Sequence, residues 1–291
     1  MSLSPSSPVP ELPEVETVKR GLNQVTLNQI ITGGDVLLAR TIAHPSSMAD
    51  FWAGLQGRTI AQWHRRGKYL LAELAPTAPD AAPAHLGVHL RMTGQLLWCD
   101  RADPLSKHTR VRFFFPGDRE LRFDDQRTFG QMWWVPPGQP PATIITGLQK
   151  LGPEPFADEF SVAYFQAQLQ QRQRPIKTAL LDQAIVAGIG NIYADEALFL
   201  TGIPPQRLCR DLTAAQIATL HGHIRAVLAA SIEVRGTTFS SFRNVDGVNG
   251  RYGGMAWVYG RDGSACRTCG TVIERIKLAG RSAHFCPTCQ R

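Results

Sequence analysis

The stretches Cys-Arg-Thr-Cys at 266–269 and Cys-Pro-Thr-Cys at 286–289 decide how the C-terminal end of this chain folds. Each pair can turn two thiolates toward one ion, and two pairs at this spacing are typical of a tetrahedral Zn²⁺ site. The residues between them predict a β-hairpin with strands at 271–277 and 282–285 and a turn at 279–280. A redox Cys-x-x-Cys is the alternative, which the presence of two pairs disfavours. We predict one structural Zn²⁺ with the ligands Cys266, Cys269, Cys286 and Cys289.

Composition excludes several classes of protein. The chain has 291 residues, 43% hydrophobic and 19% charged, which excludes collagenous and wholly disordered chains and suggests about two domains. No apolar run approaches the roughly 20 residues that span a bilayer, and residues 1–8 do not resemble a secretory signal. Without a secretion signal, the six cysteines do not indicate a disulfide framework. Cys99 and Cys209, outside the two pairs, are expected to be buried free thiols.

Positive charge is concentrated near the C-terminus. Lys and Arg number 31 against 24 Asp and Glu, and residues 231–291 hold nine against four. Such an excess suits a polyanionic partner, but a basic tail is also a common solvated feature. Charge alone therefore leaves nucleic-acid binding open.

The first half of the chain alternates like a β protein. An amphipathic helix is predicted at 13–27, and a Pro-rich break separates the halves between 136 and 157. The pattern between them favours a sandwich or barrel over a parallel sheet. The predicted strands lie at 69–74, 86–98, 111–115, 120–123 and 131–135.

The second half is predicted to be helical. Thr213 and Gln216 form a capping-box pattern before one helix. Two further helices, at about 175–185 and 191–200, flank the glycine-rich turn 186–190, where free backbone N–H groups suit a phosphate. A plain turn between packed helices would look the same.

The sequence Pro-Glu-Leu-Pro-Glu-Val-Glu-Thr at 10–17 is, taken alone, a proline-initiated helix with acidic residues at its positive end. Together with other motifs in the same order, it resembles the formamidopyrimidine-DNA glycosylase family from residue 10 to residue 291. These motifs are RRGKYLL at 65–71, HLRMTGQL at 89–96, DQRTFG at 125–130, LGPEP at 151–155, GIGNIYADE at 188–196, VYGR at 258–261 and the four-cysteine finger.

The resemblance implies an α+β multidomain fold with an N-terminal β-sandwich, flanking helices, a helix-two-turn-helix domain and the zinc-finger hairpin. The expected boundaries are an extension at 1–9, a catalytic domain at 10–136, a linker at 137–157, a helical DNA-binding domain at 158–255 and the zinc finger at 256–291. The family's loop over the flipped base corresponds to 246–255.

The resemblance also implies a covalent mechanism. Pro10 would attack C1′ of the damaged nucleotide through its ring nitrogen and form a Schiff base, with Glu11 as the adjacent acid/base and Glu14 as a supporting carboxylate. Lys68 would contact DNA beside the lesion and assist elimination. Arg281, at the hairpin turn, would grip the flanking phosphates and serve in δ-elimination.

Other positions match family DNA contacts. Asn191 would bind a phosphate. His108 and Arg127 would also contact DNA, and so, by a looser match, would Arg172. Met92, Arg127 and Phe129 would fill the space left by the extruded nucleotide, although pattern alone would place Met92 and Phe129 in the core. His89 also matches, but an isolated histidine on a strand is as readily a core residue.

Pro10 departs from the family pattern because eight residues separate it from Met1. An internal proline nitrogen is an amide with no usable lone pair. Translation from Val9 followed by methionine removal, or proteolysis, would expose Pro10; otherwise the chain is a non-catalytic descendant.

The sequence therefore predicts a bifunctional DNA glycosylase (hydrolase) and AP lyase that removes 8-oxoguanine and formamidopyrimidines from damaged double-stranded DNA. The alternatives are an endonuclease VIII-like enzyme for oxidised pyrimidines and a non-catalytic damage-binding zinc-finger protein. We expect a bacterial, cytoplasmic monomer without membrane contact.

Overall fold

The computed structural model describes residues 9–76, 80–236, 245 and 252–291. Nearly all of the predicted extension at 1–9, and 246–251 of the predicted loop at 246–255, lie outside these residues. The described chain falls into two compact units, 9–150 with Val245, and 151–236 with 252–291. The finer predicted division of the chain into domains stays a prediction.

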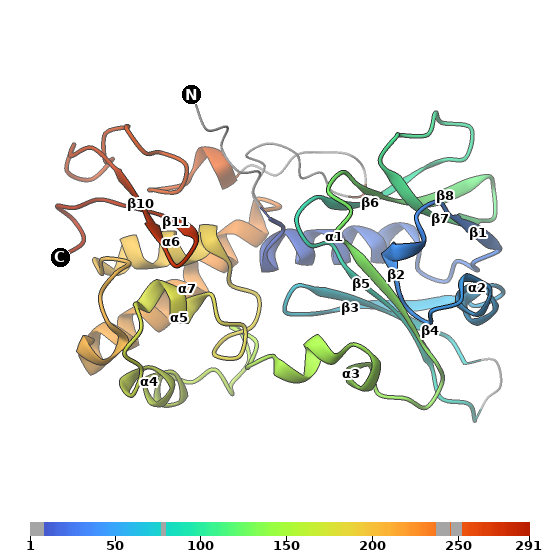
Figure 1. The fold of residues 1–291 in the computed structure, drawn as a ribbon, viewed down its shortest axis with the longest axis horizontal. Coiled ribbons are helices and arrows are strands. Elements are labelled where there is room, and N and C mark those ends of the chain that lie inside the picture. Colours follow the sequence, from blue (N-terminus) through green and yellow to red (C-terminus); the bar gives the residue numbers. More distant parts are fainter. Residues whose placement is uncertain (1–8, 77–79, 237–244, 246–251) are drawn as a thin grey trace. The chain divides into compact units, whose positions relative to one another are not determined.

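The N-terminal unit is a β-sandwich with the helix α1 (Leu12–Val25), as predicted (Figure 1). Its four-stranded sheet has the order β1-β7-β8-β6 and its five-stranded sheet the order β2-β9-β5-β4-β3. All pairs are antiparallel except β2 and β9. The strands are β1 (Gly33–Val36), β2 (Ile42–His44), β3 (Ile60–Arg66), β4 (Tyr69–Leu74), β5 (Ala84–His89), β6 (Gly94–Asp100), β7 (Thr109–Phe115), β8 (Arg119–Asp125) and β9 (Gln131–Val135).

One apolar core holds this unit together. Leu70 and Val88 of the five-stranded sheet and Val111 and Phe123 of the four-stranded sheet belong to a single buried cluster, which also includes Val15 of α1. The alternating apolar residues that predict strands are thus the inner faces of the sandwich. The short helices α2 (Met48–Leu55) and α3 (Pro141–Ile144) complete the unit.

The prediction of one continuous strand at 86–98 is wrong, because the chain turns between β5 and β6. Arg91 adopts φ +55°, and the N–H of Gly94 donates to the carbonyl of Leu90 at 2.9 Å. A Cβ atom at Gly94 would lie 2.5 Å from that carbonyl oxygen, so the turn requires glycine there. Met92 consequently lies on a turn rather than on a strand.

The C-terminal unit is built on helices α4 (Val162–Gln170), α5 (Ile176–Leu180), α6 (Asn191–Thr201) and α7 (Ala214–Glu233). The predicted capping box is confirmed, since Gln216 N–H donates to Thr213 Oγ1 at 3.2 Å and Thr213 N–H to Gln216 Oε1 at 3.0 Å. The helix predicted at 175–185 ends earlier, at Leu180. There Asp182 Oδ1 accepts the N–H of Ala184 at 3.0 Å, a side-chain bond that competes with helix continuation.

The zinc-finger hairpin consists of β10 (Glu274–Leu278) and β11 (Arg281–Phe285), with the predicted turn at Ala279 and Gly280. Ile273 and Cys286, on either side of the hairpin, belong to a small apolar cluster with Phe199 of α6, and Phe199 stacks on Trp257 at 5.6 Å. Helices of the described chain are all too short or too polar to cross a lipid bilayer. Short 3-10 turns lie at Ala39–Thr41, Thr146–Lys150, Cys209–Asp211 and Tyr252–Gly254.

Glu196 of α6 caps the segment that leads into the finger. Its fully buried carboxylate accepts the N–H groups of Trp257 at 2.8 Å and of Val258 and Tyr259 at 3.0 Å. Burial raises the pKa of Glu196 in spite of these three bonds, and the neighbouring Asp195 adds to the rise. Glu196 thus satisfies three backbone N–H groups that would otherwise lack a hydrogen-bond acceptor.

We expect Glu196→Ala to lower the free energy of unfolding by about 2–4 kcal/mol, because it leaves buried donors unpaired. Urea unfolding followed by circular dichroism measures the change. Glu233→Ala, at an exposed position of α7, is the control and should change it by less than about 0.5 kcal/mol. Equal effects of the two substitutions would contradict the capping role.

Candidate catalytic and DNA-binding site

Pro10, Glu11 and Glu14 form one compact group at the start of α1. All three are buried, and Glu11 and Glu14 close a capping box in which Glu14 Oε2 accepts the N–H of Glu11 at 2.9 Å. A capping box fixes the backbone at a helix start. The two acidic residues predicted beside Pro10 are therefore held in place by the helix itself.

Lys68 lies on the Gly67-Lys68 turn between β3 and β4, and an ion pair ties this turn to α1. Arg65 Nε donates to Glu16 Oε2 at 3.0 Å, while its Nη1 donates to the carbonyl of Gly67 at 3.1 Å. Burial opposes ionisation of Glu16, but hydrogen bonds and charge from Lys19 and Arg65 outweigh it and lower the pKa of Glu16. The structure thus joins the Lys68 turn to the helix that follows Pro10.

His89 is a buried neutral imidazole at the end of β5. Its Nδ1 accepts the N–H of Arg91 at 2.9 Å, and its ring meets Tyr69 edge to face at 4.5 Å. Burial, followed by the positive charges of Arg91 and Lys68, lowers the pKa of His89 to about 3. It supports the turn that carries Met92 and is not an imidazolium acid at neutral pH.

Arg127 and Phe129 lie on the loop between β8 and β9. Phe129 is 51% exposed, and the Arg127 guanidinium carbon lies 5.2 Å from the centre of its ring. The pattern-based expectation that Phe129 belongs to the core is wrong, because the loop turns its ring outward. An exposed aromatic ring beside an arginine suits contact with unstacked bases.

His108 precedes β7 and is half-buried. Its carbonyl accepts the N–H of Asp125 at 2.9 Å, and its Nδ1 lies 3.5 Å from Arg110 Nη2. Asp125 is two residues before Arg127, so the structure brings His108 next to the Arg127 loop.

Asn191 and Arg281 are linked through Ser282 in the C-terminal unit. Asn191 is the first residue of α6, and its Nδ2 donates to Ser282 Oγ at 3.4 Å. Its Oδ1 is buried and accepts no hydrogen bond from the described residues. Arg281 is exposed and follows the Ala279-Gly280 turn, next to Ser282. A helix N-terminus, an amide and a guanidinium gathered in this way suit a DNA phosphate.

A buried ion pair lies behind this group. Lys177 Nζ lies 2.6 Å from Asp195 Oδ1 and also donates to the carbonyl of Ser282. Asp195 Oδ2 accepts the backbone N–H of His284 at 2.9 Å and contacts its Nδ1 at 3.1 Å. These bonds attach β11, and with it Arg281, to α5 and α6.

Arg172 makes its side-chain hydrogen bonds away from this group. It follows α4, where its Nε donates to the carbonyl of Gln168 at 2.6 Å and its Nη2 to Gln168 Oε1 at 3.0 Å. Two donors of the guanidinium therefore bind the end of the helix that Arg172 follows.

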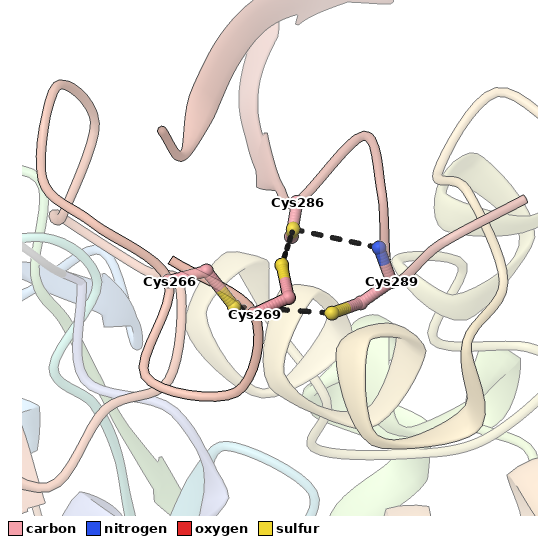
Figure 2. Close-up of side chains that lie close together, drawn as sticks. All are labelled: Cys266, Cys269, Cys286 and Cys289. Carbon is pink, nitrogen blue, oxygen red and sulfur yellow. Dashed lines mark hydrogen bonds between the residues drawn. The ribbon is translucent and has the colours of Figure 1, made fainter. Parts of the chain in front are cut away.

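The four cysteines of the finger converge, as Figure 2 shows, from two separate loops. Their Sγ atoms all lie within 4.8 Å of one another, with Cys266 to Cys289 at 3.9 Å and Cys269 to Cys286 at 3.4 Å. Ligands about 2.3 Å from a tetrahedral Zn²⁺ are about 3.8 Å apart, so the donor set fits one structural zinc. Four thiolates leave no position for water, and the metal serves the fold of the hairpin.

Several residues that build the site were not predicted. Five of them act through partners distant in sequence, namely Thr93, Asp125, Glu16, Arg65 and Ser282. Lys177, Asp195, Glu196 and His284 are charged or titratable groups in the interior. The signal available from the sequence was placement within the quoted motifs, which include Glu16, Arg65, Thr93, Asp125, Asp195 and Glu196.

The neutral state of His89 predicts a specific pH dependence of stability. Below a pH of about 6.5 the unfolded chain binds a proton at His89 that the folded chain does not bind. Stability from this site is thus fully present above that pH and is lost, by about 1.4 kcal/mol per pH unit, as the pH falls toward 3. His89→Asn, which keeps an acceptor near Nδ1, should lack this loss in urea unfolding at pH 7, 6, 5 and 4. Parallel curves for the two proteins would contradict the assignment.

Zinc removal should abolish DNA binding by the finger. We expect one Zn²⁺ per chain, measured by a chromogenic chelator after thiol modification, and a loss of DNA affinity of at least about tenfold on its removal. Cys286→Ser should behave like the stripped protein, whereas Cys99→Ser, outside the cluster, should keep one Zn²⁺. Full affinity without metal would overturn the structural role.

Family models match three consecutive parts of the chain. The N-terminal domain of formamidopyrimidine-DNA glycosylase matches residues 9–132, the H2TH domain of the same family matches 151–243, and a zinc finger found in FPG and IleRS matches 263–291. Together these spans contain all of the predicted site residues.

Whole-chain relatives agree with these matches. Formamidopyrimidine-DNA glycosylases of a Nostoc species and of Acaryochloris marina are 64% and 62% identical over 282 residues, which cover 97% of this chain and 100% and 99% of theirs. A Lactococcus lactis FPG variant bound to DNA containing Fapy-dG superposes with a TM-score of 0.88 at 34% identity, over 97% of this chain and 100% of that one. The MutM (FPG) protein of Thermus thermophilus superposes with a TM-score of 0.85 at 39% identity, over 97% and 98%. The chain therefore belongs to the formamidopyrimidine-DNA glycosylase family and is a DNA glycosylase of base excision repair.

Proposed function

We propose that this enzyme excises oxidised purines, chiefly 8-oxoguanine and formamidopyrimidines, from duplex DNA and then cleaves the strand by β- and δ-elimination. The observation that carries the proposal is the Pro10-Glu11 pair at the buried start of α1, with the Lys68 turn tied to the same helix through Arg65. The Lactococcus lactis relative's complexes with Fapy-dG and abasic DNA support the choice of substrate.

The reaction begins with the secondary amine of Pro10. Its lone pair attacks C1′ of the damaged nucleotide, the N-glycosidic bond breaks, and the base leaves with a proton. Glu11 serves as the acid/base that helps to open the sugar ring and form the iminium, and Glu14 holds Glu11 in place. A terminal amine has a pKa of about 7.7–8, so an appreciable fraction is nucleophilic at neutral pH.

Strand cleavage follows from the iminium. Loss of the acidified C2′ proton expels the 3′ phosphate, and a second elimination expels the 5′ phosphate. Lys68 supplies a positive charge beside the sugar during these steps. Arg281 binds the phosphates that flank the lesion and promotes the second elimination.

This chemistry requires Pro10 to carry a free amine, and we propose that the active form begins at Pro10. Initiation at Val9 with removal of the initiator methionine, or proteolysis, would produce it. Within residues 1–291 as printed, Pro10 is an amide and cannot form the iminium.

Borohydride trapping tests this requirement. The printed chain and a form whose initiator methionine directly precedes Pro10 are each incubated with an 8-oxoguanine:C duplex, and the adduct is located by peptide mapping. We expect an adduct at Pro10 from the short form only, and none from the full chain, in which Pro10 stays acylated by Val9. DNA binding without trapping by either form would favour the non-catalytic damage-binding alternative and reject the proposed mechanism.

The phosphate contacts are assigned to Asn191 and Arg281, which Ser282 joins. Arg281→Ala should reduce the slope of log affinity against log salt by about one and leave β-elimination products in place of δ-elimination products. Arg275→Ala removes the same charge from the same hairpin, where Arg275 pairs with Asp262 at 3.9 Å, and serves as the control. Identical product ratios in the two variants would reject the role of Arg281.

The lesion is reached by extrusion of its nucleotide, since a stacked base is inaccessible. Met92, Arg127 and Phe129 then fill the vacated space, and Arg127 faces the orphaned cytosine. His108 contacts the DNA backbone beside the loop of Arg127 and Phe129, and His89, as a neutral hydrogen-bond acceptor, supports the turn that carries Met92. Arg172 adds a further backbone contact from the end of α4.

Oxidised pyrimidines are the second candidate substrate class. The Lactococcus lactis relative has been solved with an oxidized-pyrimidine DNA, which favours some overlap of lesions. Excision from 8-oxoguanine:C should exceed that from a thymine-glycol duplex; the reverse order would assign the endonuclease VIII-like specificity. We further propose that the enzyme is cytoplasmic and acts as a monomer. Sedimentation with and without DNA tests the monomeric state.

A further inference from the structure

Asp125, the last residue of β8, is a buried carboxylate that joins the two loops of the void-filling side chains. It is 1% exposed. One oxygen accepts the hydroxyl of Thr93, and the other accepts the N–H of Gly130 at 2.7 Å. Thr93 follows Met92, while Gly130 follows Phe129, so a single carboxylate holds one end of each loop.

Thr93 extends this connection to Arg127. Its Oγ1 accepts the backbone N–H of Arg127 at 2.9 Å while its hydroxyl hydrogen goes to Asp125. The hydroxyl is thus used as donor and acceptor at once, which valine cannot imitate. Gly94, the residue after Thr93, pairs with Asp125 across β6 and β8, so the backbone brings Thr93 close to Asp125.

The loop that is held in this way has a constrained backbone. Thr128 adopts φ +59°, an unfavourable conformation for a β-branched residue that persists only when its surroundings impose it. It stands between Arg127 and Phe129, whose side chains lie against each other. A Cβ atom at Gly130 would lie 2.4 Å from Phe123 Cζ and 3.0 Å from Asp125 Oδ2, so the far end of the loop packs closely against both side chains.

We propose that Asp125 and Thr93 form a positioning pair that presets Met92, Arg127 and Phe129 for insertion into the duplex. The pair does not touch the reacting atoms; it removes the need to order two loops at the moment of extrusion. This inference rests on the proposed function, because it concerns the side-chain insertion that accompanies nucleotide extrusion. It assigns base extrusion, and not the elimination chemistry, as the step that the pair controls.

The test compares Thr93→Val, Thr93→Ser and the wild type, each beginning at Pro10. Under single-turnover conditions, Thr93→Val should slow excision of 8-oxoguanine opposite cytosine by about 10–100-fold, in line with the cost of displacing a positioned group. Cleavage of a preformed abasic site, where no base has to be extruded, should change by less than about threefold. Thr93→Ser, which keeps the hydroxyl, should restore excision.

A 2-aminopurine placed next to the lesion reports insertion directly, and its fluorescence rise should be slowed in Thr93→Val by the same factor as excision. Thr109→Val is the matched control, because Thr109 Oγ1 donates to Asp124 at 2.7 Å on the neighbouring strand outside both loops. It should leave excision and fluorescence unchanged.

The outcomes separate the two claims. If the wild type fails to excise 8-oxoguanine, the proposed function falls. If the wild type excises it and Thr93→Val does so at the same rate, the positioning pair alone is rejected. A parallel loss of excision and abasic cleavage with a lowered melting temperature would show a purely structural role and would also reject the pair.

Discussion

Two adjacent buried carboxylates on α6 hold the C-terminal unit together. Asp195 binds Lys177 and His284, and Glu196 binds three consecutive backbone N–H groups before the finger. A buried carboxylate is tolerated only when donors surround it, so each acid fixes the segment that supplies its donors. The hairpin, its turn and the group that joins Asn191 and Arg281 through Ser282 depend on these two side chains as well as on the metal.

The N-terminal unit uses charge in a different way. Around α1, acids are paired locally, as Glu14 with the Glu11 backbone and Glu16 with Lys19 and Arg65. Around the β5–β6 turn the charges are positive, and they help to keep His89 neutral. The result is an acidic group next to Pro10 and a basic rim on the adjoining strands, which suits acid/base chemistry on a polyanion.

The sequence predicts features whose partners are close along the chain. The cysteine pairs, the Thr213–Gln216 capping box and the Ala279-Gly280 turn follow from spacing or from conformational preference, and the structure contains all three. The turn at 91–93 was not predicted, because the residue with the positive φ is Arg91 rather than a glycine. It also lies within an apolar run, which indicated a continuous strand.

Long-range features were beyond such reasoning. The strands β1, β2 and β3 owe their pairing to partners elsewhere in the chain and show no strong alternation. The acceptor roles of Asp125 and Glu196 depend on donors brought to them by folding, Thr93 32 residues away and Trp257 61 residues away. The family resemblance pointed to the residues of the site, but not to the hydrogen bonds that hold them.

The capping box at the start of α1 has a consequence for the variation that the catalytic end of the protein can accept. Serine, threonine, asparagine and aspartate are the usual residues at a helix start, and any of them would serve α1 as a cap. Here the cap is Glu11, which directly follows Pro10 and is its acid/base in the proposed mechanism. Under the proposed mechanism one residue meets two separate demands, local folding and proton transfer, and substitutions that satisfy the first would fail the second. A position that several polar residues could fill as a cap is thereby restricted, under that mechanism, to a carboxylate long enough to serve both purposes.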